Sequence, residues 1–190
     1  MLDWYNLMKL INNDDRDSIN EIAYEFPRQK KRSQPAQLII RSKYGGGGTA
    51  GSPSVHSCSI KVKLDTNRIY PIMVPKLGEQ IDESNKNKVS TGAYLREVLD
   101  DDKLYKAVVG FIYVNQVAIL AYWNSPDEER GLIGTAIGDF LKARMTTVDY
   151  YDRSVQKPRT AKQLKEDQKE LESYVQEKFK ERTITLRYTP

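Results

Sequence analysis

The chain has 190 residues, 39% of them hydrophobic, and a formal net charge of +4. This size predicts one domain with a single core, and the modest charge excess does not by itself indicate a nucleic-acid partner. Cys58 is the single cysteine, which excludes an internal disulfide, and no uninterrupted apolar run reaches the ~20 residues that span a bilayer. With no signal-peptide pattern at the start, we expect the chain to fold in the cytoplasm and to bind no membrane.

The first 27 residues predict a helical hairpin. Apolar residues crowd positions 2–11, and Asp17 is a suitable N-cap for a second helix. In that second helix Ile19, Ile22, Ala23 and Phe26 recur at helical spacing, and Pro27 ends it.

Residues 28–53 form a basic and glycine-rich segment, which we interpret as an arm. Its predicted interaction residues are Arg28, Lys30, Lys31, Arg32, Gly45, Gly46, Gly47 and Gly48. The basic run is typical of a solvated linker, or of a contact with phosphate or an acidic partner. The glycine run lacks the Gly-Lys-Ser/Thr ending of a phosphate-binding loop, and a short strand over residues 38–41 lies between the two runs.

The remaining residues, 54–190, predict an α+β core. Residues 59–64 alternate between apolar and polar side chains, and residues 68–74 form a second strand in which Pro71 indicates an edge. Asp65, Thr66 and Asn67 would join the two strands as a hairpin. A long polar excursion over residues 76–91 and a short helix over residues 93–99 follow.

The centre of the predicted sheet is a second hairpin. Residues 107–114 and 117–123 are apolar runs rich in β-branched and aromatic side chains, separated by Asn115 and Gln116. Ser125, followed by Pro126 and with Glu128 three residues later, predicts the start of an amphipathic helix over residues 127–145 that packs on this hairpin.

The last third predicts a strand at residues 147–151, a largely solvated helix at residues 160–180, and a strand at residues 182–188. The predicted fold is therefore α+β, with a mostly antiparallel sheet around the central hairpin and helices flanking it at both ends of the chain.

No catalytic residue, metal site or cofactor is predicted. His56 and Cys58 are two residues apart and cannot complete a tetrahedral zinc site, because the chain has no second cysteine or histidine. Paired carboxylates occur, but no nucleophile or lysine accompanies them in a recognisable spacing.

The segment 117–144 resembles the acyl-CoA pyrophosphate segment of GNAT acetyltransferases, in which a strand leads into a helix whose N-terminal amides hold the phosphates. The resemblance implies acyl-CoA binding at Arg130, Gly131, Gly134 and Thr135. The segment departs from the family pattern at two positions, where Glu129 occupies the usual Gln or Arg and Leu132 occupies the first glycine.

The resulting functional hypothesis is a non-enzymatic structural protein that assembles with copies of itself or with other subunits. A virion or phage head–tail connector is one concrete setting, in which the protein would be incorporated into a virion. Two alternatives stay open: a GNAT-like acyltransferase, and a nucleic-acid-binding protein that uses residues 28–32 with Lys43.

Overall fold

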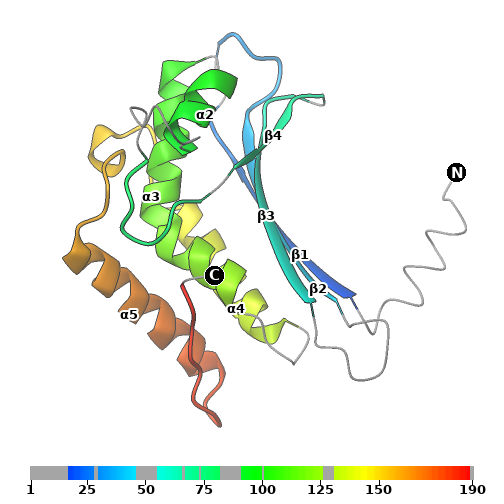
Figure 1. Ribbon diagram of the computed structural model, residues 1–190, viewed down its shortest axis with the longest axis vertical. Helices are drawn as coiled ribbons and strands as arrows, with labels where there is room; N and C mark the ends of the chain where they lie inside the picture. The colour runs from blue at the N-terminus through cyan, green and yellow to red at the C-terminus, as the bar shows by residue number, and fades with distance from the viewer. Residues whose placement is uncertain are drawn as a thin grey trace, which may run out of the picture.

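The computed structural model describes residues 17–27, 30–45, 55–65, 67–72, 74–81, 91–99, 101–125 and 131–188. In this part of the chain, a four-stranded antiparallel sheet comes first and helices follow it, as Figure 1 shows. The strands are β1 (Asp17–Glu25), β2 (Gln37–Gly45), β3 (Val55–Lys63) and β4 (Ile69–Ile72). The helices are α2 (Thr91–Val98), α3 (Asp102–Asn124), α4 (Leu132–Met145), the 3-10 turn η1 (Arg153–Val155) and α5 (Ala161–Lys178). The predicted α+β class is confirmed, whereas the helices lie C-terminal to the sheet and do not flank it at both ends.

The sheet is a simple meander in the order β1-β2-β3-β4, with one face toward the helices. Its register aligns four buried isoleucines in a row across the strands, namely Ile22, Ile40, Ile60 and Ile72. Because side chains alternate between the two faces of a strand, this row fixes the inner face of all four strands at once.

The prediction of a helix over residues 17–26 is wrong, because these residues form β1. Ile22 and Phe26 are buried and Tyr24 is half-buried, whereas Glu21 and Glu25 are exposed, which is the period of two expected of a strand. The helical pattern was based on the isoleucines and Phe26 and did not include Tyr24. With Tyr24 included, alternate residues 22, 24 and 26 face the core, as in a strand. The first predicted helix, at residues 2–11, lies outside the described residues.

The hairpin between β3 and β4 is confirmed. Asp65 shapes its turn by accepting hydrogen bonds from the backbone N–H groups of Asn67 and Arg68, at 3.0 and 2.9 Å. Pro71 lies on an edge strand, as its missing N–H requires. The strand expected over residues 38–41 also exists, within the longer β2.

The predicted central hairpin is wrong: residues 107–123 belong to one continuous helix, α3. Its N-cap is Asp101, whose carboxylate accepts a hydrogen bond from Leu104 N at 2.9 Å. The helix buries 18 of its 23 residues, so its apolar side chains occupy every side and leave no helical period to read. The favoured two-residue hairpin turns need positive φ angles, which glycine adopts most readily. Asn115-Gln116 contains no glycine, so the sequence also lacked a signal for the turn of the predicted hairpin.

Asn115 and Gln116 are instead anchor points inside α3. Gln116 Nε2 donates to the carbonyl oxygens of Pro75 and Lys76 at 3.1 and 2.9 Å, and so holds the start of the polar excursion on the helix. Asn115 Nδ2 donates to the Phe111 carbonyl and to the Tyr150 hydroxyl, each at 2.9 Å.

The other helices cover the remaining sides of α3. Gly138 of α4 lies against Ile22 of β1 and Tyr122 of α3, where a Cβ atom would approach Ile22 to 3.3 Å.

The predicted start of this helix is only partly described. Residues 126–130, including the predicted capping residues Pro126 and Glu128, are outside the described part. Ser125 ends α3 and does not start α4, since its backbone N–H bonds to the Ala121 carbonyl. Leu132, the first residue of α4, is 50% exposed.

The C-terminal elements are partly as predicted. Helix α5 begins at a capping box formed by Thr160 and Gln163. Residues 147–151 form a turn and not a strand. Residues 182–188 are extended with Leu186 buried, but they lie beside α3 and α5 outside the sheet, where Ser125 Oγ accepts a hydrogen bond from Arg187 N at 2.8 Å.

By length and composition alone, α3 could cross a membrane, and it is the one helix of the described residues that passes that test. Its most apolar 18-residue window is 94% buried inside the fold, as is usual for the core helix of a globular protein.

We expect Phe111→Ala to lower the free energy of unfolding by ~3–5 kcal/mol, because Phe111 is fully buried on α3 and packs against Tyr24, Phe26 and Tyr150. Denaturant titration measures this loss. Leu132→Ala, at a half-exposed position, is the control and should cost less than about 1 kcal/mol. Equal losses in the two variants would contradict the central place of α3.

Candidate functional site

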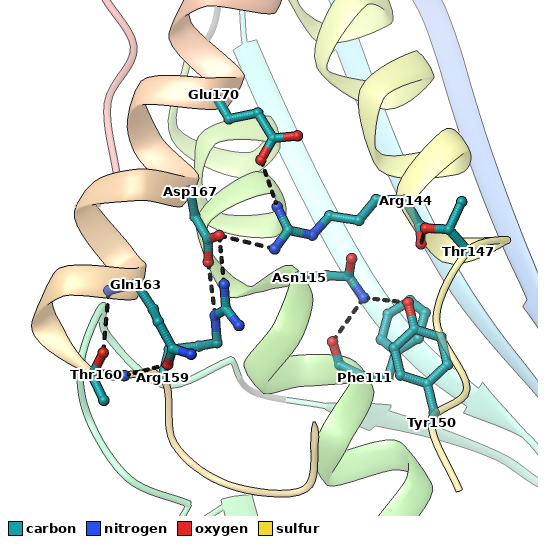
Figure 2. Close-up of polar contacts among 10 residues, drawn as sticks. All are labelled: Phe111, Asn115, Arg144, Thr147, Tyr150, Arg159, Thr160, Gln163, Asp167 and Glu170. Carbon is teal, nitrogen blue, oxygen red and sulfur yellow. Dashed lines mark hydrogen bonds and ion pairs between the residues drawn. The ribbon is translucent and has the colours of Figure 1, made fainter. Parts of the chain in front are cut away.

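A buried polar cluster joins α4, α5 and the loop before α5 (Figure 2). Asp167 of α5 is 4% exposed and accepts hydrogen bonds from Arg144 at 2.9 Å and from Arg159 at 2.7 and 2.9 Å. Both arginine side chains are mostly buried and share the Asp167 carboxylate, and Arg144 also lies 3.6 Å from the exposed carboxylate of Glu170. No nucleophile is among these groups, and the cluster clamps α5 onto the core. The sequence analysis missed it, because its residues are spread over three segments.

Of the predicted basic and glycine runs, the described residues lie at opposite ends of the sheet. Lys30, Lys31 and Arg32 form the connection from β1 to β2, at the top of Figure 1, whereas Gly45 is the last residue of β2. Strand β2 separates them by about 26 Å, at a rise of ~3.3 Å per residue. The described residues of the two runs are therefore not neighbours. Arg28, Gly46, Gly47 and Gly48 lie outside the described residues.

The basic run meets the beginning of α3 at two adjoining hollows. One, of ≈ 320 Å³, is lined by Lys31, Arg32, Arg68 and Asp101 among others. The second, of ≈ 540 Å³, is lined by Pro27, Lys30, Lys31, Asp101, Asp102, Lys103 and Tyr151. Lys31 lines both hollows, so they meet at its side chain.

The carboxylates at this end are already engaged by other groups. Asp102 contacts Arg96 Nη1 at 2.6 Å and Lys106 Nζ at 3.0 Å, and the hydrogen bond from Arg96 is the largest cause that lowers its pKa. Asp101 caps α3. Asp65 pairs with Arg68 at 2.8 Å, and hydrogen bonds from the backbone N–H of Asn67 and from Arg68 lower its pKa.

By contrast, Lys30, Lys31 and Lys103 are exposed and form no ion pair with another described residue. The larger hollow therefore has three ammonium groups whose charge is not locally balanced. We call Lys30, Lys31, Lys103 and Tyr151, together with this hollow, the basic hollow. Lys103 and Tyr151 were missed from the sequence, because only the fold brings them beside residues 30–31.

A second surface is the open side of the sheet. None of the described helices covers the outer face of the sheet in Figure 1, where Glu21 pairs with Arg41 and Gln37 Nε2 donates to Glu25 at 3.4 Å. The strand order also leaves β1 at one edge, with no described strand on its far side.

The residues implied by the acyltransferase resemblance gather at the start of α4, except Arg130, which lies outside the described part. Gly131 has φ 79° and no side-chain cap, and Thr135 Oγ1 donates to the Gly131 carbonyl at 2.9 Å. Gly134 is buried. The element before them is helix α3, however, and not the strand on which the resemblance depends.

Within the described residues, no group of three or more histidines, cysteines, aspartates or glutamates could hold a metal ion. Of the predicted pair His56 and Cys58, only the backbone is described, as part of β3. Comparison of the chain with protein-family models, with curated proteins and with solved structures finds no match.

We expect Asp167→Ala to lower the free energy of unfolding by ~3–5 kcal/mol, because it leaves two mostly buried guanidinium groups without their carboxylate. Glu170→Ala is the matched control. Glu170 is 67% exposed on the same helix and lies 3.6 Å from Arg144, so its loss should cost about 0–1 kcal/mol in denaturant titration. Similar costs for both variants would rule out the clamp.

We also expect stability to fall in alkaline solution through Tyr150, since burial raises its pKa to about 12. The unfolded chain ionises this tyrosine near pH 10, so its contribution is complete below pH 10 and is lost as the pH rises through 12. Between pH 9 and pH 11, the free energy of unfolding should fall by roughly 1 kcal/mol more for the unchanged chain than for a Tyr150→Phe variant, as measured by urea titration. Parallel pH profiles for the two proteins would contradict the raised pKa.

Proposed function

We propose that the protein is a non-enzymatic structural component that assembles with copies of itself through the edge of β1. A subunit of a larger particle, such as a virion or a phage head–tail connector, is the setting that the sequence analysis favours by analogy. The observation that carries the proposal is the difference between the two edges of the sheet.

Edge strands offer unpaired N–H and C=O groups to other chains, and natural proteins usually protect them with prolines, lysines, bulges or short lengths. The β4 edge is protected, because that strand has four residues and contains Pro71. The β1 edge has none of these devices: nine residues pair with β2 in unbroken register, without lysine or proline.

Two of the three charged residues of β1, Glu21 and Glu25, do not protect its edge either. Glu21 contacts Arg41 Nε at 2.8 Å, and Glu25 accepts its hydrogen bond from Gln37, so both carboxylates are held toward β2. The backbone groups on the far side of β1 therefore support the addition of another strand.

The charges also limit the register of two β1 strands that pair antiparallel about a two-fold axis. A pair centred on Glu21 or on Ala23 opposes carboxylates, which is unfavourable. A pair centred on Ile22 places Glu21 opposite the partner's Ala23, and no two glutamates are directly opposed. We propose this register, one of those that the charges allow, as a closed and self-complementary contact.

Substitution of Ala23 tests this register. Ala23→Glu should weaken self-association at least tenfold, because the new carboxylate faces the partner's Glu21 twice across the two-fold axis, whereas Ala23→Lys should preserve or strengthen it. Light scattering behind size-exclusion chromatography and native mass spectrometry, over a range of concentrations, measure the association.

Ala143→Glu is the matched control, since Ala143 is exposed on α4 and the substitution changes net charge equally. It should leave association unchanged. A chain that stays monomeric at all concentrations, or one that Ala23→Glu and Ala23→Lys affect alike, would contradict the proposal.

A further inference from the structure

The basic hollow combines two kinds of group that seldom meet by chance, namely unbalanced amines and an aromatic side chain. Lys30 and Lys31 come from the connection between β1 and β2, Lys103 from the first turn of α3, and Tyr151 from the turn after α4. Four residues from three separate segments thus line one hollow of ≈ 540 Å³, within the ~300–1,000 Å³ usual for ligand sites.

The amines favour an anionic ligand with several charges. Asp101 and Asp102 line the same hollow. Asp102 is bound by Arg96 and Lys106, whereas Asp101, which caps α3, keeps its negative charge, so the three lysines leave a net positive charge in the hollow. The adjoining hollow shares Lys31 and Asp101 with the basic hollow and adds Arg32, Arg68 and Asp65, of which Arg68 and Asp65 pair with each other. A flexible ammonium group is a suitable contact for phosphate oxygens.

The aromatic wall favours a ligand that also carries a flat ring. Tyr151 is half-buried and packs against the core, which holds its ring in place at the hollow, and Pro27 adds a second apolar surface. Single-stranded nucleic acids are bound by this combination, in which basic groups follow the backbone and aromatic side chains stack on bases.

We infer that the basic hollow is a binding site for a nucleotide unit, with the phosphates on Lys30, Lys31 and Lys103 and the base against Tyr151. The same chemistry is present in a free nucleotide and in a single-stranded nucleic acid. The path from the larger to the smaller hollow through Lys31 favours a ligand with more than one phosphate. The inference is independent of assembly through β1, which lies on a different part of the molecule.

The test measures binding of a fluorescently labelled oligothymidylate to the full chain by anisotropy, at several salt concentrations. We expect saturable binding that weakens with salt, with a slope of about −0.7 in log K per log salt for each phosphate contact. Lys31→Ala and Lys103→Ala should each weaken binding about tenfold and reduce the salt slope by about one contact.

Lys165→Ala is the matched control for charge, because Lys165 is exposed on α5 and forms no ion pair with a described residue. It should leave binding within twofold of the unchanged chain. Tyr151→Leu should weaken binding about tenfold without changing the salt slope, and Tyr151→Phe should restore it, since stacking needs the ring and not the hydroxyl.

Competition separates the two sources of the ligand. Displacement of the oligomer by dTTP at similar nucleotide concentration supports a free nucleotide, whereas displacement only by another oligomer supports a nucleic acid strand; both support the site. Three results would overturn it: no saturable binding, equal losses in Lys165→Ala and Lys31→Ala, or displacement by inorganic triphosphate as effective as by dTTP with Tyr151→Leu unchanged.

Discussion

The rest of the structure depends on the burial of α3 on all sides. A helix with 18 buried residues among 23 cannot lie at a surface, so it requires the inner face of the sheet on one side and α4 and α5 on the others. This requirement explains the close approach at Gly138, where α4 fits between Ile22 and Tyr122. The clamp at Asp167 serves the same requirement, because it fastens α5 to Arg144 of α4, the helix that packs against Tyr122 of α3.

Much of the fold could be predicted from the sequence wherever one side of an element faces water. The hairpin of β3 and β4 and helix α5 have polar and apolar faces, and both were predicted, as was the edge position of Pro71. Helix α5 was predicted with nearly its observed bounds, whereas β3 begins at Val55 and not at the predicted residue 59. Period and turn chemistry carry the information in such elements, because burial is limited to one face.

The wrong predictions concern elements whose sequence does not show one polar face and one apolar face at a single clear period. Residues 107–123 are apolar throughout, so composition rich in valine and isoleucine favoured strands, although tertiary burial decides the conformation of such a run. In β1, alternate residues Glu21, Ala23 and Glu25 face outward, but the spacing of Ile19, Ile22 and Phe26 matches a helix as well. The basic hollow could be predicted only in part, because Lys103 and Tyr151 reach Lys30 and Lys31 through the fold alone.

The two surfaces that we consider functional differ in how they recognise a partner. The β1 edge offers backbone groups, which are the same in every protein, and obtains its selectivity from the register that avoids opposed carboxylates. The basic hollow offers side chains from separate segments, so its selectivity depends on the fold being complete. One surface therefore exists once the sheet has formed, and the other requires α3 and the turn at Tyr151 in place.

The order of elements along the chain also has a consequence during synthesis. All four strands leave the ribosome before Asp102, where α3 begins, so the row Ile22, Ile40, Ile60 and Ile72 has no cover while the following segment is being made. At roughly 5–20 residues per second, this interval lasts several seconds. A nascent sheet with an uncovered apolar face and a long unprotected edge is a good substrate for chaperones, and a poor one for folding at high concentration without them.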